Sequence, residues 1–169
     1  MNEKNRTEVN FRLKRAQILY DADNNAYIEG NMMPDETGKP KAALIDITQD
    51  GNIDRVNRVM NLAVSECREM LYPYSKQEIQ TEDCDNEPTT PEEYVITAAF
   101  PEDLSQTTVE LIANLLHEYV TGRVLSDWLS ITKPESAAKW YSEIESIKLK
   151  LKQTMSIRRK KLRRGRSPF

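Results

Sequence analysis

Two long helical patterns in the last third of the chain constrain the fold more than any other feature. Over residues 103–130, adjacent apolar pairs return every four to five positions, which gives a wide apolar face suited to burial on two sides. Over residues 135–157, one apolar stripe follows helical spacing. The pairs are Leu111/Ile112, Leu115/Leu116, Tyr119/Val120, Val124/Leu125 and Trp128/Leu129, and the stripe is Trp140, Ile144, Ile147, Leu151 and Met155. We expect these helices to form an αα-hairpin core, with Leu116 buried.

The junction between these two helices carries a capping signal. Thr132 is followed three residues later by Glu135, which fits a capping box at the start of the second helix. Pro134 between them is tolerated in a first helical turn.

A third helix is predicted over residues 53–72, with Asp50 or Asn52 as its cap and Pro73 as its end. Segments 42–48 and 93–100 have the composition of strands. These three predictions place a helix between two short β segments.

The N-terminal part is harder to assign. Residues 5–21 favour a helix, although the alternation of Val9, Phe11 and Leu13 allows a short strand instead. Residues 21–30 indicate a turn followed by a short extended piece, and residues 31–41 a loop.

An acidic stretch interrupts the middle of the chain. Residues 75–92 have almost no apolar side chains and include two prolines, which predicts a mobile acidic loop. The expected fold is mainly α: a compact bundle of about four helices in residues 1–157, with one or two short β segments and a C-terminal tail from 158 to 169.

Charge is distributed unevenly along the chain. Residues 158–169 hold seven of the 24 Lys and Arg residues and none of the 27 Asp and Glu residues. The tail therefore carries +7 and residues 1–157 carry −10, within a formal net charge of −3. Such asymmetry suggests an interaction tail.

Composition argues against several classes of protein. No apolar run approaches the roughly 18 residues that span a membrane, and the first residues lack the apolar segment of a signal peptide. Cys67 and Cys84 form no CxxC motif, and there is a single histidine, too few ligands for a Cys/His zinc site. We expect a soluble, cytoplasmic protein with free thiols and no metal or cofactor.

Candidate catalytic and metal sites fail on their missing residues. Segments 46–57 and 21–32 resemble calcium loops, but each lacks the final glutamate ligand. His117 and Asp127 are ten residues apart and cannot touch within one straight helix. No glycine-rich phosphate loop is present. The sequence therefore predicts no catalytic residue.

Four aromatic residues surround the turn of the hairpin: Tyr119, Trp128, Trp140 and Tyr141. Two interpretations stay open for them. They pack in the core of the αα-hairpin, or they anchor a subunit interface, where Trp and Tyr are favoured.

The tail has three possible roles: binding nucleic-acid phosphates, docking on an acidic protein surface, or remaining a solvated end. Pro168 and Phe169 at the terminus favour docking, because Phe169 could fill an apolar pocket of a partner. The basic residues that would face acidic groups are Arg158, Arg159, Lys160, Lys161, Arg163, Arg164 and Arg166. Arginine can bind a carboxylate through two parallel hydrogen bonds.

Three stretches resemble small proteins encoded in the structural-gene cassettes of Bacteroides-type phages and prophages. They are RAQILYDADNNAYIEG (15–30), RVNRVMNLAVSECREMLYPY (55–74) and LLHEYVTGRVLSDWLSITKPESAAKW (115–140), followed by the arginine-rich C-terminus. This group looks like phage head–tail connector (adaptor, head-completion) proteins.

The resemblance implies a helical virion protein at the neck of the particle and no enzymatic activity. Connectors of this kind form a ring, commonly of twelve copies, under the portal protein. The ring extends the channel through which double-stranded DNA passes, and a terminal segment of each subunit reaches the portal. The alternative function is a helical nucleic-acid-binding protein that uses the basic tail as its arm.

Overall fold

The computed structural model describes residues 6–31, 47–48, 51–75, 85–101 and 104–156 of the 169-residue chain. This part is mainly helical, with one two-stranded antiparallel sheet. The elements in chain order are β1 (Arg6–Lys14), α1 (Arg15–Asn31), α3 (Ile53–Met70), α4 (Tyr72–Ser75), β2 (Glu93–Pro101), α5 (Gln106–Thr132) and α6 (Pro134–Ser156). None of the described helices is long and apolar enough to cross a membrane.

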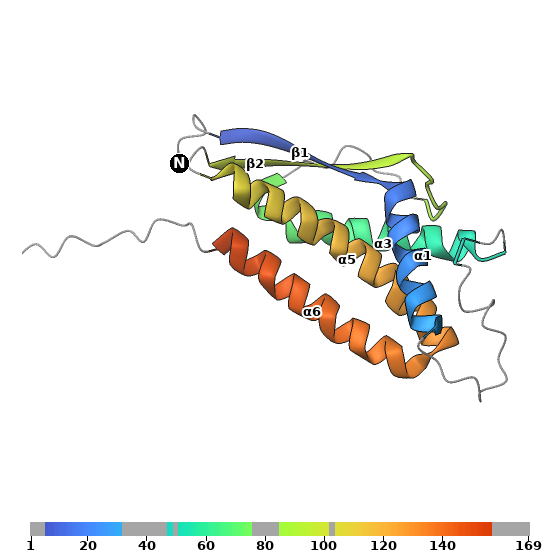
Figure 1. Cartoon of the computed structure of the whole chain (residues 1–169). Helices are drawn as coiled ribbons and strands as arrows, with labels where there is room; N and C mark the ends of the chain where they lie inside the picture. Colours follow the sequence, from blue (N-terminus) through green and yellow to red (C-terminus); the bar gives the residue numbers. More distant parts are fainter. Residues whose placement is uncertain (1–5, 32–46, 49–50, 76–84, 102–103, 157–169) are drawn as a thin grey trace, which may run out of the picture.

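Helix α5 is the centre of the molecule, and α1, α3 and α6 pack around it (Figure 1). Its second half is almost entirely buried from Tyr119 to Leu129, where only Arg123 and Asp127 keep moderate exposure. Leu116 is fully buried, as the sequence predicted. The wide apolar face predicted over residues 103–130 thus packs against three neighbouring helices.

Close contact between α5 and α6 depends on a glycine. A Cβ atom on Gly122 would lie 3.2 Å from Cγ1 of Ile144 on α6, closer than ordinary van der Waals contact. The two helices therefore approach where α5 has no side chain. On α6, the predicted stripe faces this contact, with Ile144, Ile147 and Leu151 buried.

The turn between α5 and α6 differs from the predicted capping box. Thr132 is the last residue of α5, and its hydroxyl donates to the carbonyl oxygen of Trp128 at 3.0 Å. Lys133 is the C-cap of α5, and α6 begins at Pro134. Because the Thr132 hydroxyl binds backward into α5, it does not cap α6.

The helix predicted over residues 5–21 is confirmed for residues 15–21, which begin α1, but it is wrong for residues 6–14. Residues 6–14 form β1, as the alternation of Val9, Phe11 and Leu13 had allowed, and they pair with β2 from Arg6↔Pro101 to Lys14↔Glu93. Phe11 and Phe100 meet edge to face, with ring centroids 6.0 Å apart. Pairing with this distant strand outweighs the local helical spacing.

The turn and extended piece predicted over residues 21–30 were also wrong, because α1 continues to Asn31. This segment is rich in Asp and Asn, which are weak helix formers. Ile18, Ala22 and Ala26 are buried on one face of α1. Tertiary packing of this face stabilises a helix that the composition disfavours.

The predictions for the third helix, its cap and the second strand agree with the structure only in part. The helix predicted over 53–72 ends at Met70, and Pro73 lies inside the short α4. Asn52 occupies the N-cap position of α3 without a side-chain capping bond. The strand over 93–100 is confirmed as β2.

Several predicted segments lie wholly or partly outside the described residues. Of the strand predicted over 42–48, only Ile47 and Thr48 are described, and they lie in a turn with Ile47 fully buried. The loop at 31–41, residues 76–84 of the acidic loop, and the tail 158–169 also fall outside. Cys67 is a buried free cysteine, and Cys84 is not described.

We expect Leu116→Ala to lower the free energy of unfolding by about 2–5 kcal/mol, because it leaves a cavity in the core. Leu111, on the same helix but 47% exposed, provides the matched control. Denaturant unfolding of Leu116→Ala and Leu111→Ala measures the difference. Equal losses would contradict the central position of Leu116.

We expect Ser126→Ala to stabilise the protein by roughly 1 kcal/mol. The Ser126 hydroxyl is fully buried and has no hydrogen-bond partner in the described part of the chain, so removing it relieves a desolvation cost. Ser142→Ala on the exposed face of α6 controls for the higher helix propensity of alanine. A gain at Ser126 no larger than the gain at Ser142 would show that the hydroxyl is satisfied.

Candidate interaction surfaces and the polar network beneath them

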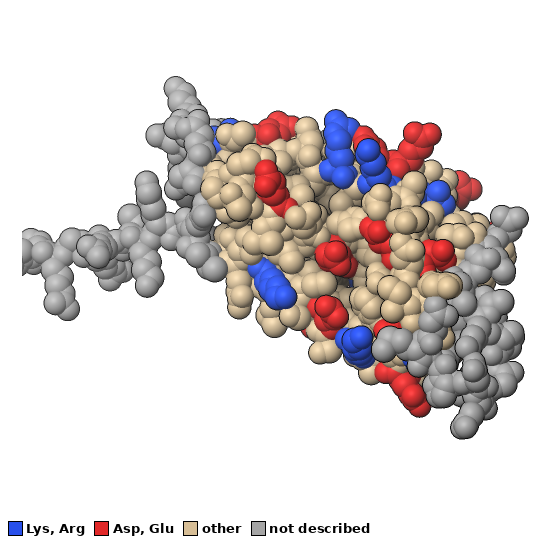
Figure 2. Space-filling view, in the orientation of Figure 1, with Lys and Arg blue, Asp and Glu red and all other residues tan. Residues whose placement is uncertain are grey.

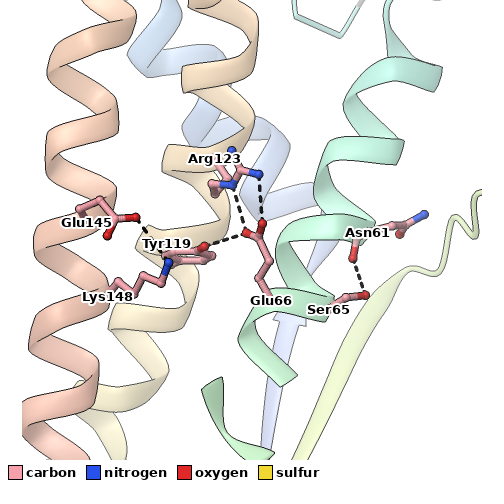
Figure 3. A network of polar contacts seen from close by, with 7 residues as sticks. All are labelled: Asn61, Ser65, Glu66, Tyr119, Arg123, Glu145 and Lys148. Carbon is pink, nitrogen blue, oxygen red and sulfur yellow. Dashed lines mark hydrogen bonds and ion pairs between the residues drawn. The ribbon is translucent and has the colours of Figure 1, made fainter. Parts of the chain in front are cut away.

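A polar network joins α3 to α5 (Figure 3). Arg123 on α5 donates two hydrogen bonds, both 3.1 Å long, to the two carboxylate oxygens of Glu66 on α3. The Tyr119 hydroxyl donates a third bond of 2.7 Å to the same carboxylate. This is the two-pronged arrangement in which arginine binds a carboxylate most strongly.

The network shifts the pKa values of its members. Burial alone would raise the pKa of the Glu66 carboxyl, but hydrogen bonds from Arg123 and Tyr119 and the charge of Arg123 outweigh it, and that pKa is lowered. Burial, followed by the bond to Glu66, raises the pKa of Tyr119. The charged carboxylate is thus the stable form, and its acceptor sites already bind donors of this chain. We infer that Glu66 holds two helices together and is poorly placed to accept a proton from a substrate.

Helix α6 borders this network. Figure 3 shows Lys148 and Glu145 on α6 beside Tyr119, with the Lys148 ammonium 3.4 Å from the Glu145 carboxylate. The positive charge of Lys148 also contributes to the lowered pKa of Glu66. All three helices therefore meet at one cluster of charges.

Asn61 on α3 holds β2 and the segment before it. Its side-chain oxygen accepts a 2.6 Å bond from the Tyr94 hydroxyl, and its amide nitrogen donates to the Thr89 carbonyl at 2.8 Å. Residues 85–92 contain no helix or strand, in agreement with the predicted loop. They nevertheless contact α3 at Thr89, so this half of the acidic loop lies on the body and does not project from it.

A second carboxylate joins α1 to the α5–α6 turn. Glu29 is 8% exposed and accepts hydrogen bonds from Ser136 at 3.0 Å and from the Trp140 indole at 3.2 Å. Burial would raise the pKa of Glu29, but these bonds and the charges of Lys139 and Lys133 lower it overall. This site fixes the C-terminal end of α1.

His117 has a partner that the sequence did not reveal. Its Nε2 lies 2.7 Å from Oδ2 of Asp21 on α1. Asp127, as predicted, does not contact His117 and instead forms a two-bond pair with Arg55 on α3, at 2.8 and 3.1 Å. Both pairs tie a covering helix to α5.

The described residues contain no group of three or more His, Cys, Asp or Glu that could hold a metal ion. Cys67 is fully buried, and this burial, followed by the nearby Glu66 charge, raises the pKa of its thiol. A thiol with a raised pKa is a weak nucleophile.

The four predicted interface aromatics separate into two classes. Tyr119 and Trp128 are 3% and 7% exposed and pack in the core of their own chain, which is the core interpretation. Trp140 packs against the same core, and its indole binds Glu29. Tyr141 is 48% exposed and remains available to a partner.

An exposed aromatic face on α1 was missed by the sequence reasoning. Tyr20, Tyr27 and Ile28 are 63%, 52% and 55% exposed. Tyr20 and Tyr27 are seven residues apart, so they lie on the same side of the helix, opposite the buried Ile18 and Ala22. The seven-residue spacing of the two tyrosines was visible in the sequence. It places them on one face only if residues 21–30 are helical, which the sequence did not predict.

The face of the molecule shown in Figure 2 carries acidic and basic side chains interspersed, without a broad basic patch. The strongest concentration of positive charge in the sequence remains the tail, and all nine of its predicted contact residues lie outside the described residues. Helix α6 leads to it. The C-terminal end of α6 lies at the end of the molecule where β1 begins and β2 ends (Figure 1).

The end of α6 is fixed to the body. The Tyr74 hydroxyl on α4 donates a 2.9 Å bond to the carbonyl of Met155, and the Tyr74 ring lies 4.9 Å from the ring of Phe100 on β2. The last turn of α6 is therefore anchored to α4 and, through Tyr74, to β2.

Comparison with known proteins identifies no relative. A scan against protein-family models gives no match, and searches of curated proteins and of solved structures give none either.

We expect Glu66→Gln to destabilise the protein by about 1–2 kcal/mol near neutral pH, because a charged acceptor of three bonds becomes a neutral one. The folded pKa of Glu66 is lower than its ordinary value of 4.5. Its stabilisation is therefore complete above the unfolded pKa and is lost as pH falls through the folded pKa. The gap between wild type and variant should narrow below about pH 4.5.

Urea unfolding at several pH values measures this effect, and Glu143→Gln on the exposed face of α6 is the control. A gap between wild type and Glu66→Gln that does not change with pH would show that the carboxylate charge contributes nothing.

Proposed function

We propose that this protein is a virion structural protein, a head–tail connector that forms a ring under the portal and extends the DNA channel. The proposal starts from the resemblance of residues 15–30, 55–74 and 115–140 to phage proteins of that group. The helical architecture is of the kind that the resemblance implies.

The observation that carries the proposal is the separation of charge between body and tail. Residues 1–157 carry −10 and residues 158–169 carry +7. A channel wall with the same sign of charge as DNA lets the duplex pass without binding it. A cationic tail suits docking on an acidic neighbour, which in this proposal is the portal protein.

The anchored α6 supports the docking role of the tail. A helix of 23 residues is about 35 Å long, and Tyr74 fixes its last turn. The described end of α6 is therefore held on the body, and in this proposal that anchoring lowers the ordering cost of reaching a fixed site on a partner. Arg158, Arg163 and the other tail cations would bind carboxylates there, and Phe169 would enter an apolar pocket.

The exposed aromatics suit contacts between neighbouring copies in a ring, commonly of twelve. Tyr20 and Tyr27 lie on α1, and Tyr141 lies on α6. These are different surfaces, and joining unlike surfaces head to tail is how a closed ring is built. Tyrosine is enriched in such interfaces because it buries a large area while keeping a hydroxyl for hydrogen bonding.

Deletion of residues 158–169 is expected to leave the fold intact and to stop incorporation into phage heads, which then stay without tails. Circular dichroism and thermal unfolding check the fold, and electron microscopy of particles checks incorporation. A control that removes only Pro168 and Phe169 keeps all seven tail cations. It therefore distinguishes the contribution of the cations from that of Phe169 in an apolar pocket. Normal particles from the full deletion would refute the docking role.

Nucleic-acid binding is the second candidate, and the arginine-rich tail is the observation that favours it. A tail that neutralises several phosphates gives an affinity for any duplex that falls steeply with added salt. A connector should assemble on the portal and bind free DNA only weakly. Titration of the intact and truncated proteins with duplex DNA at several salt concentrations distinguishes the two functions.

A further inference from the structure

The two edges of the β1–β2 sheet are protected unequally. The Arg15 N–H donates to the Glu92 carbonyl at 3.0 Å, one pair beyond the last strand residues. Hydrogen-bonded and non-hydrogen-bonded pairs alternate along an antiparallel ladder. The Arg15–Glu92 bond therefore shows which residues of each strand bond to the other strand and which point to the outer edge. Val9, Phe11 and Leu13 bond to β2, while the backbone groups of Glu8, Asn10 and Arg12 point to the outer edge of β1.

The outer edge of β2 is partly capped. By the same alternation, the Val95 and Pro101 carbonyls point outward. The Val95 carbonyl accepts a 3.4 Å bond from the Arg68 guanidinium, and the Pro101 carbonyl accepts a 3.0 Å bond from the Leu104 N–H. Proline also lacks the N–H that a further strand would need.

The outer edge of β1 has no such protection among the described residues. The sheet has only two strands, so β1 is an edge strand along its whole length, and it begins at the top of the molecule in Figure 1. The first half of β1 is also solvent-exposed on both faces apart from Val9. A nine-residue strand with an unpaired edge is a template for strand addition.

We propose that the outer edge of β1 pairs with the outer edge of β1 from a second copy of this chain, forming a four-stranded antiparallel sheet across a two-fold axis. Within the described residues, the outer edge of β1 is the less protected of the two sheet edges, so the matching surface on a second copy is its own β1. When the axis passes through Asn10, the pairing covers all nine residues of the strand.

Charge complementarity supports this occupant. In that register, Glu8 of each copy lies directly opposite Arg12 of the other copy, on the solvent face of the sheet. Opposite charges at directly opposed positions stabilise an antiparallel pair, and like charges destabilise it. Arg12 also pairs with Glu93 of its own chain through one guanidinium nitrogen, and the remaining donors of that group can serve a second carboxylate. The like-charged Arg6 and Lys14 meet only at the strand ends, where solvent screens them.

This inference goes beyond the connector proposal. A two-fold contact uses the same surface on both copies and closes at two, so it cannot build a cyclic ring. We assign the dimer to the free protein, where it shields the open edge, and the dimer must separate before subunits enter a ring. A strand-to-strand contact of this length is small, so the dimer should dissociate on dilution.

The first test is the association state of the purified full-length protein, measured by light scattering over a range of concentrations. We expect a dimer at high concentration. Glu8→Arg, which sets an arginine side chain against Arg12 in both symmetric pairs, should raise the dissociation constant at least about tenfold. Arg12→Glu should weaken the dimer similarly, and the double variant Glu8→Arg/Arg12→Glu should restore it. Glu118→Arg on α5 is the matched control and should have no effect.

Amide hydrogen exchange identifies the surface used. In the dimer, the N–H groups of Glu8, Asn10 and Arg12 should be protected, and dilution or Glu8→Arg should expose them. The N–H groups of Phe11 and Leu13 bond to β2 and should stay protected throughout. A protein that is monomeric at every concentration overturns the proposal. A dimer in which the N–H groups of Glu8, Asn10 and Arg12 still exchange rapidly overturns it as well. So does a double variant that fails to form the dimer.

These results are independent of the connector proposal. If the strands do not pair, the prediction for the tail deletion and its particle phenotype still stands. A tail deletion without a phenotype would equally leave the dimer in place.

Discussion

The almost complete burial of the second half of α5 is the constraint on which the rest of the structure depends. A helix that is apolar on nearly all sides must be covered on nearly all sides, and α1, α3 and α6 provide that cover. Each covering helix approaches α5 in a different way. Helix α1 is tied by Asp21 to His117, α3 by Glu66 to Arg123, and α6 by Ile144 against Gly122.

The elements predicted correctly were those whose signal is local. Helices α3, α5 and α6 follow their own apolar periodicity, and β2 is a short run of β-favouring residues. The predictions for residues 6–14 and 21–30 failed because the contacts that decide their structure are not local. Whether 6–14 becomes helix or strand depends on β2, which begins only at Glu93. Residues 21–30 become helical because buried Ala22 and Ala26 meet a core that the local sequence does not contain.

The candidate sites were predictable to a different degree. The tail was visible from the sequence because seven cations within twelve residues form a compositional signal that needs no fold. The pairs Glu66–Arg123 and Asp21–His117 join distant residues through single side chains, and no spacing rule connects them. Tyr119 and Trp128 illustrate a third case. Aromatic residues serve cores and interfaces alike, so only burial could assign these two to the core.

The pairing of β1 with β2 has a consequence for the order of events during synthesis. The ribosome releases β1 well before its partner strand, which ends at Pro101, and the central helix α5 follows only after that. The apolar side chains of Phe11 and Leu13 therefore lack their native neighbours until β2 and α5 have been made. Contacts between segments so far apart in sequence form slowly, because a large loop must close first. During that interval β1 is consequently exposed to chaperones and to premature association.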